Sequence, residues 1–349
     1  MQLRGWEWFY LSKQAKTKGG YRPEEIDISD LEKRAEGNTE RLPQTQTSSP
    51  IAAMEWSPDG VTMAWCQHNG HLVAWDRLLR KQLWSHTSPS DGSHVSIVFT
   101  PTGSELAVIV PGKGLTLFDA RTGTERWQVG DVDGGVDVLD GGKHIVTSRA
   151  SRSRDIGASA ALLFLETNTG KVVSKSTVPG RPMVHQLVAS NVQNCVVTVG
   201  PGGTGVVPLE ATEALELFKL GTHTVGHKTA IAFAKDGSTL AVASDSGGIE
   251  VLFSLGWEEE QLLGLTERRL QGERSTSFEA NVPTITNLQF VQNADRLLVS
   301  SRESVTLWDP IVGERLLEFR GADFGAMSPD GRKLAVHQAG RLAVFEPRE

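Results

Sequence analysis

Apolar and polar residues alternate along most of the chain from Ile51 onwards, and short clusters of Pro, Asp, Asn and Gly interrupt the alternation. In the first stretch, the alternating segment Ile51–Trp56 leads through Ser-Pro-Asp to Gly60, and further segments follow at Met63–Trp65 and Leu72–Asp76. A period of two is typical of β-strands, because successive side chains of a strand point to opposite faces. The Asp-Gly dipeptides supply the positive φ that tight hairpins need. The pattern predicts an antiparallel unit of strands joined by tight turns.

This unit recurs at intervals of roughly forty residues, a period typical of repeat architectures. A tight turn after the first strand of each copy ends at Gly60, Gly103, Gly142, Asn194, Gly237, Asp295 and Gly331. Longer intervals come from insertions near Arg149–Ser159 and Gly256–Ser277. A four-stranded unit cannot bury both faces alone, whereas units packed radially can, and only short edges then stay exposed. The sequence therefore predicts an all-β protein, a single seven-bladed β-propeller of four-stranded antiparallel blades.

Several motifs in phase with this repeat are similar to those of a known family. They are Trp75-Asp76, Trp308-Asp309 and Phe118-Asp119 at the ends of third strands, Ser57-Pro-Asp-Gly60 and Ser328-Pro-Asp-Gly331 in turns, and Gly226-His227 before a first strand. In these motifs the chain resembles the WD-repeat family of β-propellers, as a divergent bacterial type, over about residues 40–349. No repeat carries the family's full hydrogen-bonded set of His, Ser or Thr, Trp and Asp. We therefore expect the blades to depend more on apolar packing.

The last repeat ends just after its third strand, so its outermost strand must come from elsewhere in the chain. The segment that begins at Gly37-Asn-Thr-Glu-Arg-Leu42 is similar to the segments that begin fourth strands in other blades. We expect residues 39–47 to supply the missing strand and to close the ring. Pro43 is tolerated in such an outer strand, because one edge of it needs no hydrogen bonds. The predicted domains are an extension at 1–38, partly helical or disordered, and the propeller at 39–349.

The extension contains a dense apolar cluster, Trp6, Trp8, Phe9, Tyr10 and Leu11. The string Leu3–Leu11 resembles the junction segment of planctomycete Ser/Thr kinase–propeller proteins, although the chain has no kinase signature motifs. Three interpretations stay open for the cluster. It packs on the side or bottom of the propeller, it forms a helix that docks a partner, or it anchors the protein at a membrane surface.

Charge and cysteine content narrow the class of protein. A net charge of -7 argues against a nucleic-acid binder, which needs a broad basic surface. Cys66 and Cys195 fall in second strands of different blades, too far apart for a disulfide, and free thiols suit a reducing compartment. The chain lacks an apolar run long enough to span a membrane, and its first residues do not resemble a signal peptide. We therefore expect a cytoplasmic protein.

Candidate chemistry is sparse. Gly200-Pro-Gly-Gly-Thr-Gly205 matches a dinucleotide-binding pattern, but a strand follows it where a helix is needed, so it is expected to be a hairpin. The aspartates at 131–137 and Asp140 resemble a calcium loop, but the loop has no acidic residue at its twelfth position. His68 and His71 match no zinc spacing. The sequence indicates no catalytic residue, metal or cofactor.

The predicted function is a scaffold that binds protein or peptide partners through one face, without catalysis of its own. Loops between second and third strands, and between blades, share that face. Its first candidate residues are three arginines in a loop of the third blade, with others in the first and sixth blades: Arg149, Arg152, Arg154, His68, His71 and Arg302. Because arginines bind carboxylates and phosphates bidentately, the expected partner is acidic or phosphorylated, with neither nucleic acid nor a membrane span involved.

Two alternatives remain. One is a propeller enzyme, a hydrolase or a quinoprotein-like protein, with a site at the central channel. The other is a detached docking or sensor domain of a Ser/Thr kinase system. In the fifth repeat the third strand is predicted to end at Phe253-Ser254, and Glu258-Glu-Glu260 is predicted to form a solvated acidic bulge on the opposite face.

Overall fold

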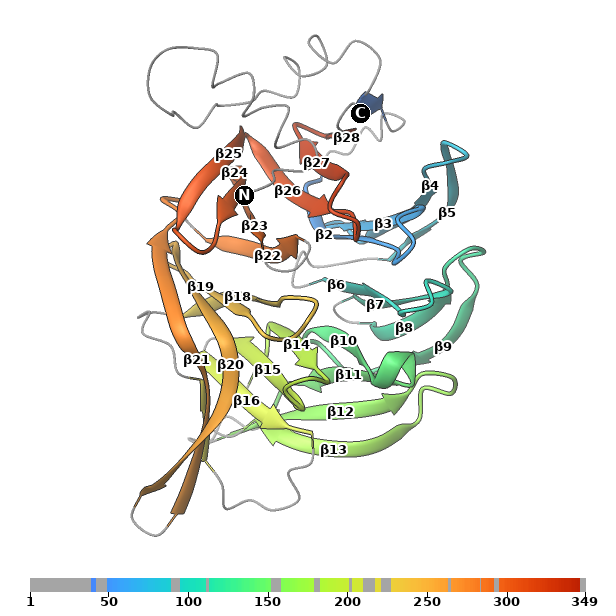
Figure 1. The fold of residues 1–349 in the computed structure, drawn as a ribbon. Coiled ribbons are helices and arrows are strands. Elements are labelled where there is room, and N and C mark those ends of the chain that lie inside the picture. The colour runs from blue at the N-terminus through green and yellow to red at the C-terminus, as the bar shows by residue number, and fades with distance from the viewer. Residues whose placement is uncertain are drawn as a thin grey trace, which may run out of the picture.

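The computed structural model describes residues 39–41, 49–88, 95–110, 113–151, 158–178, 183–200, 203–209, 217–220, 227–262, 265–282, 284–291 and 295–345. The extension at 1–38 and the stretch at 42–48 lie outside these residues. The described residues are almost entirely strands and tight turns (Figure 1). Their helical content is one 3-10 turn, η1 (Asp140–Gly142), and no helix among them is long and apolar enough to cross a membrane.

After β1, most strands follow one another in groups of four, each group forming one blade. β1 itself belongs to the sheet of the last blade, and β17 pairs with the blade that follows it. In chain order they are β1 (Thr39–Arg41), β2 (Ile51–Trp56), β3 (Thr62–Gln67), β4 (His71–Asp76), β5 (Lys81–Thr87), β6 (Ser96–Phe99), β7 (Glu105–Val110), β8 (Gly114–Asp119), β9 (Glu125–Val129), β10 (Val136–Leu139), β11 (His144–Arg149), β12 (Ala160–Glu166), β13 (Val172–Val178), β14 (Gln186–Ser190), β15 (Cys195–Gly200), β16 (Gly203–Pro208), β17 (Leu217–Leu220), β18 (Lys228–Phe233), β19 (Leu240–Ser244), β20 (Gly248–Leu262), β21 (Leu265–Glu279), β22 (Ile285–Val291), β23 (Arg296–Ser301), β24 (Ser304–Asp309), β25 (Glu314–Arg320), β26 (Ala322–Met327), β27 (Leu334–Gln338) and β28 (Arg341–Phe345).

Seven sheets surround a common axis, which confirms the predicted all-β, seven-bladed propeller. The first strands of successive blades, β2, β6, β10, β14, β18, β22 and β26, contact one another in a closed ring. Each chain segment then runs outward through its blade. The ring closes as predicted, because β1 pairs with β28 and completes the sheet β1-β28-β27-β26, with Thr39 opposite Phe345.

Blades 4 and 5 share strands in a way that the repeat does not show. The described sheet of blade 4 is β14-β15-β16, and the next segment, β17, pairs in parallel with β21 of blade 5. Strands β20 and β21 are 15 residues long each and form a hairpin that extends past the other blades (Figure 1). The predicted acidic bulge is therefore wrong. Glu258 and Glu259 lie inside β20, opposite Arg269 and Arg268 of β21.

The core is divided among the interfaces between neighbouring blades. Each buried apolar cluster of the described residues draws on two adjacent blades. Trp65 and Trp75 of blade 1, for example, pack with Phe324 and Leu342 of blade 7. Because each blade is covered on both faces, most of its apolar side chains become exposed to water only if the neighbouring blades unfold. The apolar packing expected from the incomplete WD-type motifs accounts for these contacts.

Polar side chains of the innermost strands also connect the blades. The Glu55 carboxylate accepts a hydrogen bond from the Phe99 backbone N–H (3.1 Å), and Asp137 accepts one from Ala189 (2.7 Å). In blade 6 the acceptor is a side-chain amide, because Gln289 Oε1 accepts a hydrogen bond from the Met327 backbone N–H (2.7 Å). A carboxyl group therefore accepts the hydrogen bond between blades 1 and 2 and the one between blades 3 and 4. Between blades 6 and 7 the acceptor is a neutral amide.

Replacing Glu55 by Gln is expected to raise stability at neutral pH. Burial raises the pKa of Glu55 well above its ordinary value, and the charge of Asp137 raises it further. Burial also raises the pKa of Asp137 to about 6. A carboxyl with a raised pKa stabilises the fold when protonated, and this contribution is lost as pH rises through the folded-state pKa. Gln keeps the acceptor oxygen for Phe99 without the buried charge.

The measurement is the midpoint of urea unfolding as a function of pH. The Glu55→Gln protein should exceed wild type at about pH 7.5, and the difference should vanish near pH 4, where wild-type Glu55 is protonated. Gln289→Glu is the converse variant, and it should become less stable as pH rises. A Glu55→Gln protein with wild-type pH dependence would contradict the argument.

Candidate functional site

The loops singled out by the sequence do gather at one end of the blades, here named the loop face. It carries the connections from second to third strands and from each blade to the next. The turns between β3 and β4, β11 and β12, β15 and β16, and β23 and β24 lie there. The Gly200–Gly205 segment is the predicted hairpin, since β15 ends at Gly200 and β16 begins at Gly203.

Arg149 lies at the base of the blade 3 loop and is held by the preceding connection between blades. Its Nε donates to the Asp131 backbone carbonyl (2.7 Å) and lies 3.5 Å from the Asp131 carboxylate. The Asp133 carboxylate accepts from the Ala150 backbone N–H (2.9 Å). The aspartates that resembled a calcium loop therefore brace the arginine loop. Two more of the candidates, Arg152 and Arg154, lie outside the described residues.

His68 lies in the turn between β3 and β4 of blade 1, and His71 is the first residue of β4. The His68 backbone N–H donates to the Pro50 carbonyl (3.1 Å), and the His71 N–H donates to Asn69 Oδ1 (3.1 Å). His71 Nδ1 lies 3.1 Å from Thr87 Oγ1 of the outermost strand. Both rings are partly exposed. The turn holds them at the surface of the loop face.

Arg302 is exposed at the tip of the turn between β23 and β24, and hydrogen bonds connect its turn to two further arginines. The Gly321 N–H donates to the Glu303 carbonyl (2.7 Å), which joins this turn to Arg320 at the end of β25. Gln338 Nε2 donates a hydrogen bond to the Arg320 carbonyl. This bond connects the end of β25 to the turn between β27 and β28, where Gln338 lies opposite Arg341.

We name His71, Arg302, Arg320 and Arg341 the basic arc. It crosses blades 6, 7 and 1 of the loop face, because blade 7 lies between the other two in the closed ring. The three arginines are exposed, and the Nε atom of Arg320 lies 3.6 Å from the Glu318 carboxylate. Sequence reasoning found Arg302 and His71 but missed Arg320 and Arg341. The only available signal was their place beside predicted loop-face turns.

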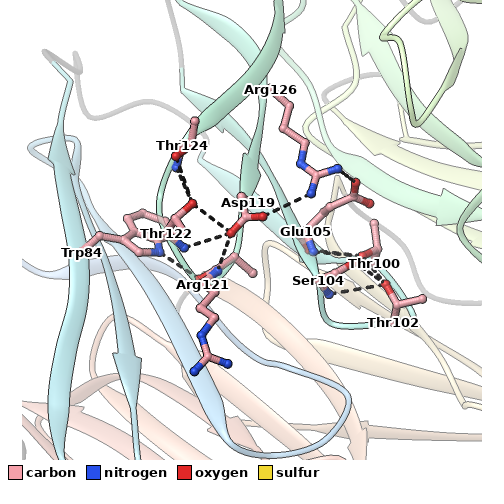
Figure 2. Close-up of polar contacts among 11 residues, drawn as sticks. Trp84, Thr100, Thr102, Ser104, Glu105, Asp119, Arg121, Thr122, Thr124 and Arg126 are labelled. Carbon is pink, nitrogen blue, oxygen red and sulfur yellow. Dashed lines mark hydrogen bonds and ion pairs between the residues drawn. The ribbon is translucent and has the colours of Figure 1, made fainter.

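The opposite end of the blades, here named the turn face, has a structural role in blades 1 and 2 (Figure 2). Asp119 Oδ1 accepts hydrogen bonds from the Thr122 N–H (2.9 Å) and from its hydroxyl (3.0 Å), which lower the pKa of Asp119. Arg126 bridges the Glu105 and Asp119 carboxylates (2.7 and 3.2 Å). Trp84 of blade 1 donates its indole N–H to the Ala120 carbonyl of blade 2 (2.8 Å). The contacts of Asp119 and Arg126 stabilise blade 2 itself, and the Trp84 hydrogen bond joins blade 1 to blade 2.

The described residues provide little material for catalysis. No three of their His, Cys, Asp and Glu side chains are grouped closely enough to hold a metal ion. Both cysteines are free, and burial raises the pKa of each thiol to about 12, so neither is a ready nucleophile. His337 pairs with Asp323 (Nδ1 to Oδ1, 2.5 Å), but the imidazole is buried in blade 7.

Comparisons with known proteins bear on the fold. No family model and no curated protein sequence matches the chain. Similar solved structures include U3-55K, 16% identical with a TM-score of 0.64, covering 88% of this chain and 98% of that one. The β-propeller domain of Cps50 (Swd1) from Myceliophteria thermophila is 15% identical with a TM-score of 0.65, covering 89% and 99%. Both are WD40 β-propeller domains. At such identities the similarity shows the fold alone.

Proposed function

We propose that this propeller is a docking platform that binds an acidic or phosphorylated protein segment on its loop face and performs no catalysis of its own. The observation that carries the proposal is the basic arc, in which hydrogen-bonded turns of blades 6 and 7 present Arg302, Arg320 and Arg341. Guanidinium groups bind carboxylates and phosphates with paired hydrogen bonds. The blade 3 loop with Arg149, Arg152 and Arg154 is a second contact region of the same face.

The rest of the chain is consistent with this role. Rigid blades hold the arc in place, so little entropy is lost when a partner binds. The resemblance of Leu3–Leu11 to the junction of bacterial kinase–propeller proteins makes a phosphorylated partner the first one to test. Two buried free thiols fit a reducing compartment such as the cytoplasm.

The test is affinity purification with mass spectrometry from the native host, using three versions of the full chain. We expect wild type to recover a partner that the triple variant Arg302→Ala/Arg320→Ala/Arg341→Ala does not recover. Replacing an anchor residue of an interface by Ala weakens the binding free energy by about 2 kcal/mol or more. The matched control is Arg121→Ala/Arg332→Ala, which removes exposed arginines of the turn face and should leave recovery unchanged.

A second version of the experiment locates the contact. Arg149→Ala/Arg152→Ala/Arg154→Ala should weaken the same interaction if the blade 3 loop belongs to the surface. If the arc variant recovers the partner as well as wild type does, the basic arc is not the binding surface. Raising the salt concentration should weaken binding to wild type, because exposed charge pairs are screened.

A further inference from the structure

Three turns of the turn face, between third and fourth strands, are capped by an Asp side chain, and a fourth is closed by the backbone carbonyl of Glu166. The four turns differ at their tips. In blade 1 the Leu79 N–H donates to Asp76 Oδ1 (2.8 Å), and in blade 6 the Ile311 N–H donates to Asp309 Oδ1 (3.0 Å). Blade 2 uses Asp119 in this way, and blade 3 turns at Glu166. In blades 2 and 3 the tip threonines also donate their hydroxyl groups to the turn carboxylate, Thr122 to Asp119 (3.0 Å) and Thr169 to Glu166 (2.6 Å). In blades 1 and 6 the aspartate accepts from backbone N–H groups, so a turn of this kind forms without a polar side chain at its tip.

The tips of blades 1 and 6 are nevertheless apolar and exposed. Leu78 and Leu79 are 65% and 58% exposed, and Ile311 and Val312 are 45% and 64% exposed. The same positions hold Arg121-Thr122 in blade 2 and Asn168-Thr169 in blade 3. Two adjacent exposed apolar side chains cost nothing in the turn but leave apolar area in water. We name Leu78, Leu79, Ile311 and Val312 the apolar rim.

The position of the apolar rim relative to the start of the propeller indicates what covers it. Blades 6 and 1 are the two neighbours of blade 7. β28 runs from Arg341 on the loop face to Phe345 on the turn face, and Thr39 lies opposite Phe345. The chain therefore enters the propeller at the turn-face end of blade 7, between the two halves of the rim.

The residues before Thr39 include a segment of matching chemistry. Trp6, Trp8, Phe9, Tyr10 and Leu11 form the densest apolar cluster of the extension. The stretch between Leu11 and Thr39 can reach roughly 90 Å when extended, at about 3.3 Å per residue, and a flexible chain of this length has a typical span of about 30 Å. Tethering also gives the segment a local concentration of about millimolar.

We propose that the segment Trp6–Leu11 docks on the apolar rim of its own propeller, covering Leu78, Leu79, Ile311 and Val312. Aromatic side chains bury large apolar areas and dominate such contacts. The segment then lies on the turn face and leaves the basic arc on the loop face open to a partner. This inference concerns a different surface and does not depend on the proposed function.

Hydrogen exchange of the full chain, read by mass spectrometry, tests the proposal. In Trp6→Ser/Trp8→Ser/Phe9→Ser we expect the amides of residues 77–80 and 309–313 to exchange about tenfold faster than in wild type, because the covering segment is lost. The amides of the polar turn at 119–123 should not change. In the reciprocal variant, Leu78→Ser/Leu79→Ser/Ile311→Ser/Val312→Ser, amides of residues 6–11 should exchange faster.

A matched control separates docking from a general effect of apolar loss. Val172→Ser/Val173→Ser removes an exposed apolar pair of blade 3, away from the entry of the chain, and should leave residues 6–11 unchanged. Unchanged exchange at the rim in the aromatic variant would overturn the proposal. Rim protection that increases with protein concentration would also overturn it, because a second copy would then be the covering partner.

Discussion

Asp309→Ala is expected to lower the free energy of unfolding by about 3–5 kcal/mol, the cost of leaving one member of a buried ion pair without its partner. Asp309 Oδ2 lies 3.6 Å from Arg296 Nη1, and the two side chains are only 10% and 8% exposed. The substitution leaves the Arg296 charge buried. It also removes the cap on the Ile311 N–H, which adds about 1 kcal/mol by analogy with helix N-caps.

Two variants divide this effect into its parts. Asp309→Asn keeps an oxygen for the cap but loses the charge, so it measures the ion pair. Asp119→Ala removes the corresponding residue of blade 2, whose partner Arg126 is exposed, and exposed pairs contribute at most about 1 kcal/mol. Urea unfolding of the three variants at neutral pH gives the comparison. Equal losses for Asp309→Ala and Asp119→Ala would contradict the importance of burial.

Trp84→Ala is expected to cost about 3–5 kcal/mol, the range for deleting a large buried aromatic side chain. Trp84 is buried between blades 1 and 2, stacks on Phe118 with ring centroids 5.6 Å apart, and donates to the Ala120 carbonyl. Its ring lies on Gly123, where φ is +72° and an added Cβ would come within 2.6 Å of the indole. Removing the ring therefore opens a cavity at the seam between two blades.

Trp84→Phe separates packing from hydrogen bonding. It keeps most of the apolar contact but removes the indole N–H, so the free energy of unfolding should fall by about 1 kcal/mol, the contribution of one hydrogen bond. The matched control is Lys175→Ala. Lys175 lies in the fourth strand of blade 3, one position after Ser174, the residue that corresponds to Trp84, and its side chain is exposed. Thermal unfolding should show a large loss for Trp84→Ala and nearly none for Lys175→Ala. A small loss for Trp84→Ala would mean that the seam is held by other contacts.

Trp127 shows that this contact between blades recurs. Its indole N–H donates to the Thr167 carbonyl of blade 3 (2.7 Å), and its ring lies on Gly170. The sequence hints at the pattern, since both tryptophans occupy the fourth strand of their repeats. It does not show which carbonyl each indole reaches, because that residue belongs to the next blade, about 40 positions away.

The sequence alone determined the architecture of this protein, including the closing strand at Thr39–Arg41. The signals for strands and turns are local: side chains alternate with a period of two, and residues such as Gly60 and Gly331 permit positive φ. Seven copies of such a unit have one compact solution, a closed ring. The positions of His68, His71 and Arg302 on loop-face turns followed from the same phase.

Only the tertiary structure decided what depends on contacts between blades. The parallel pairing of β17 with β21 and the length of the β20–β21 hairpin override the repeat. Arg149 faces Asp131, and Arg320 and Arg341 join Arg302 in one arc, through hydrogen bonds between residues far apart in the chain. Burial likewise distinguishes the ion pair of Asp309, whose side chain and that of Arg296 are 10% and 8% exposed, from that of Asp119, whose partner Arg126 is exposed. Local sequence cannot encode these differences, because each arises from the neighbours that ring closure places beside a residue.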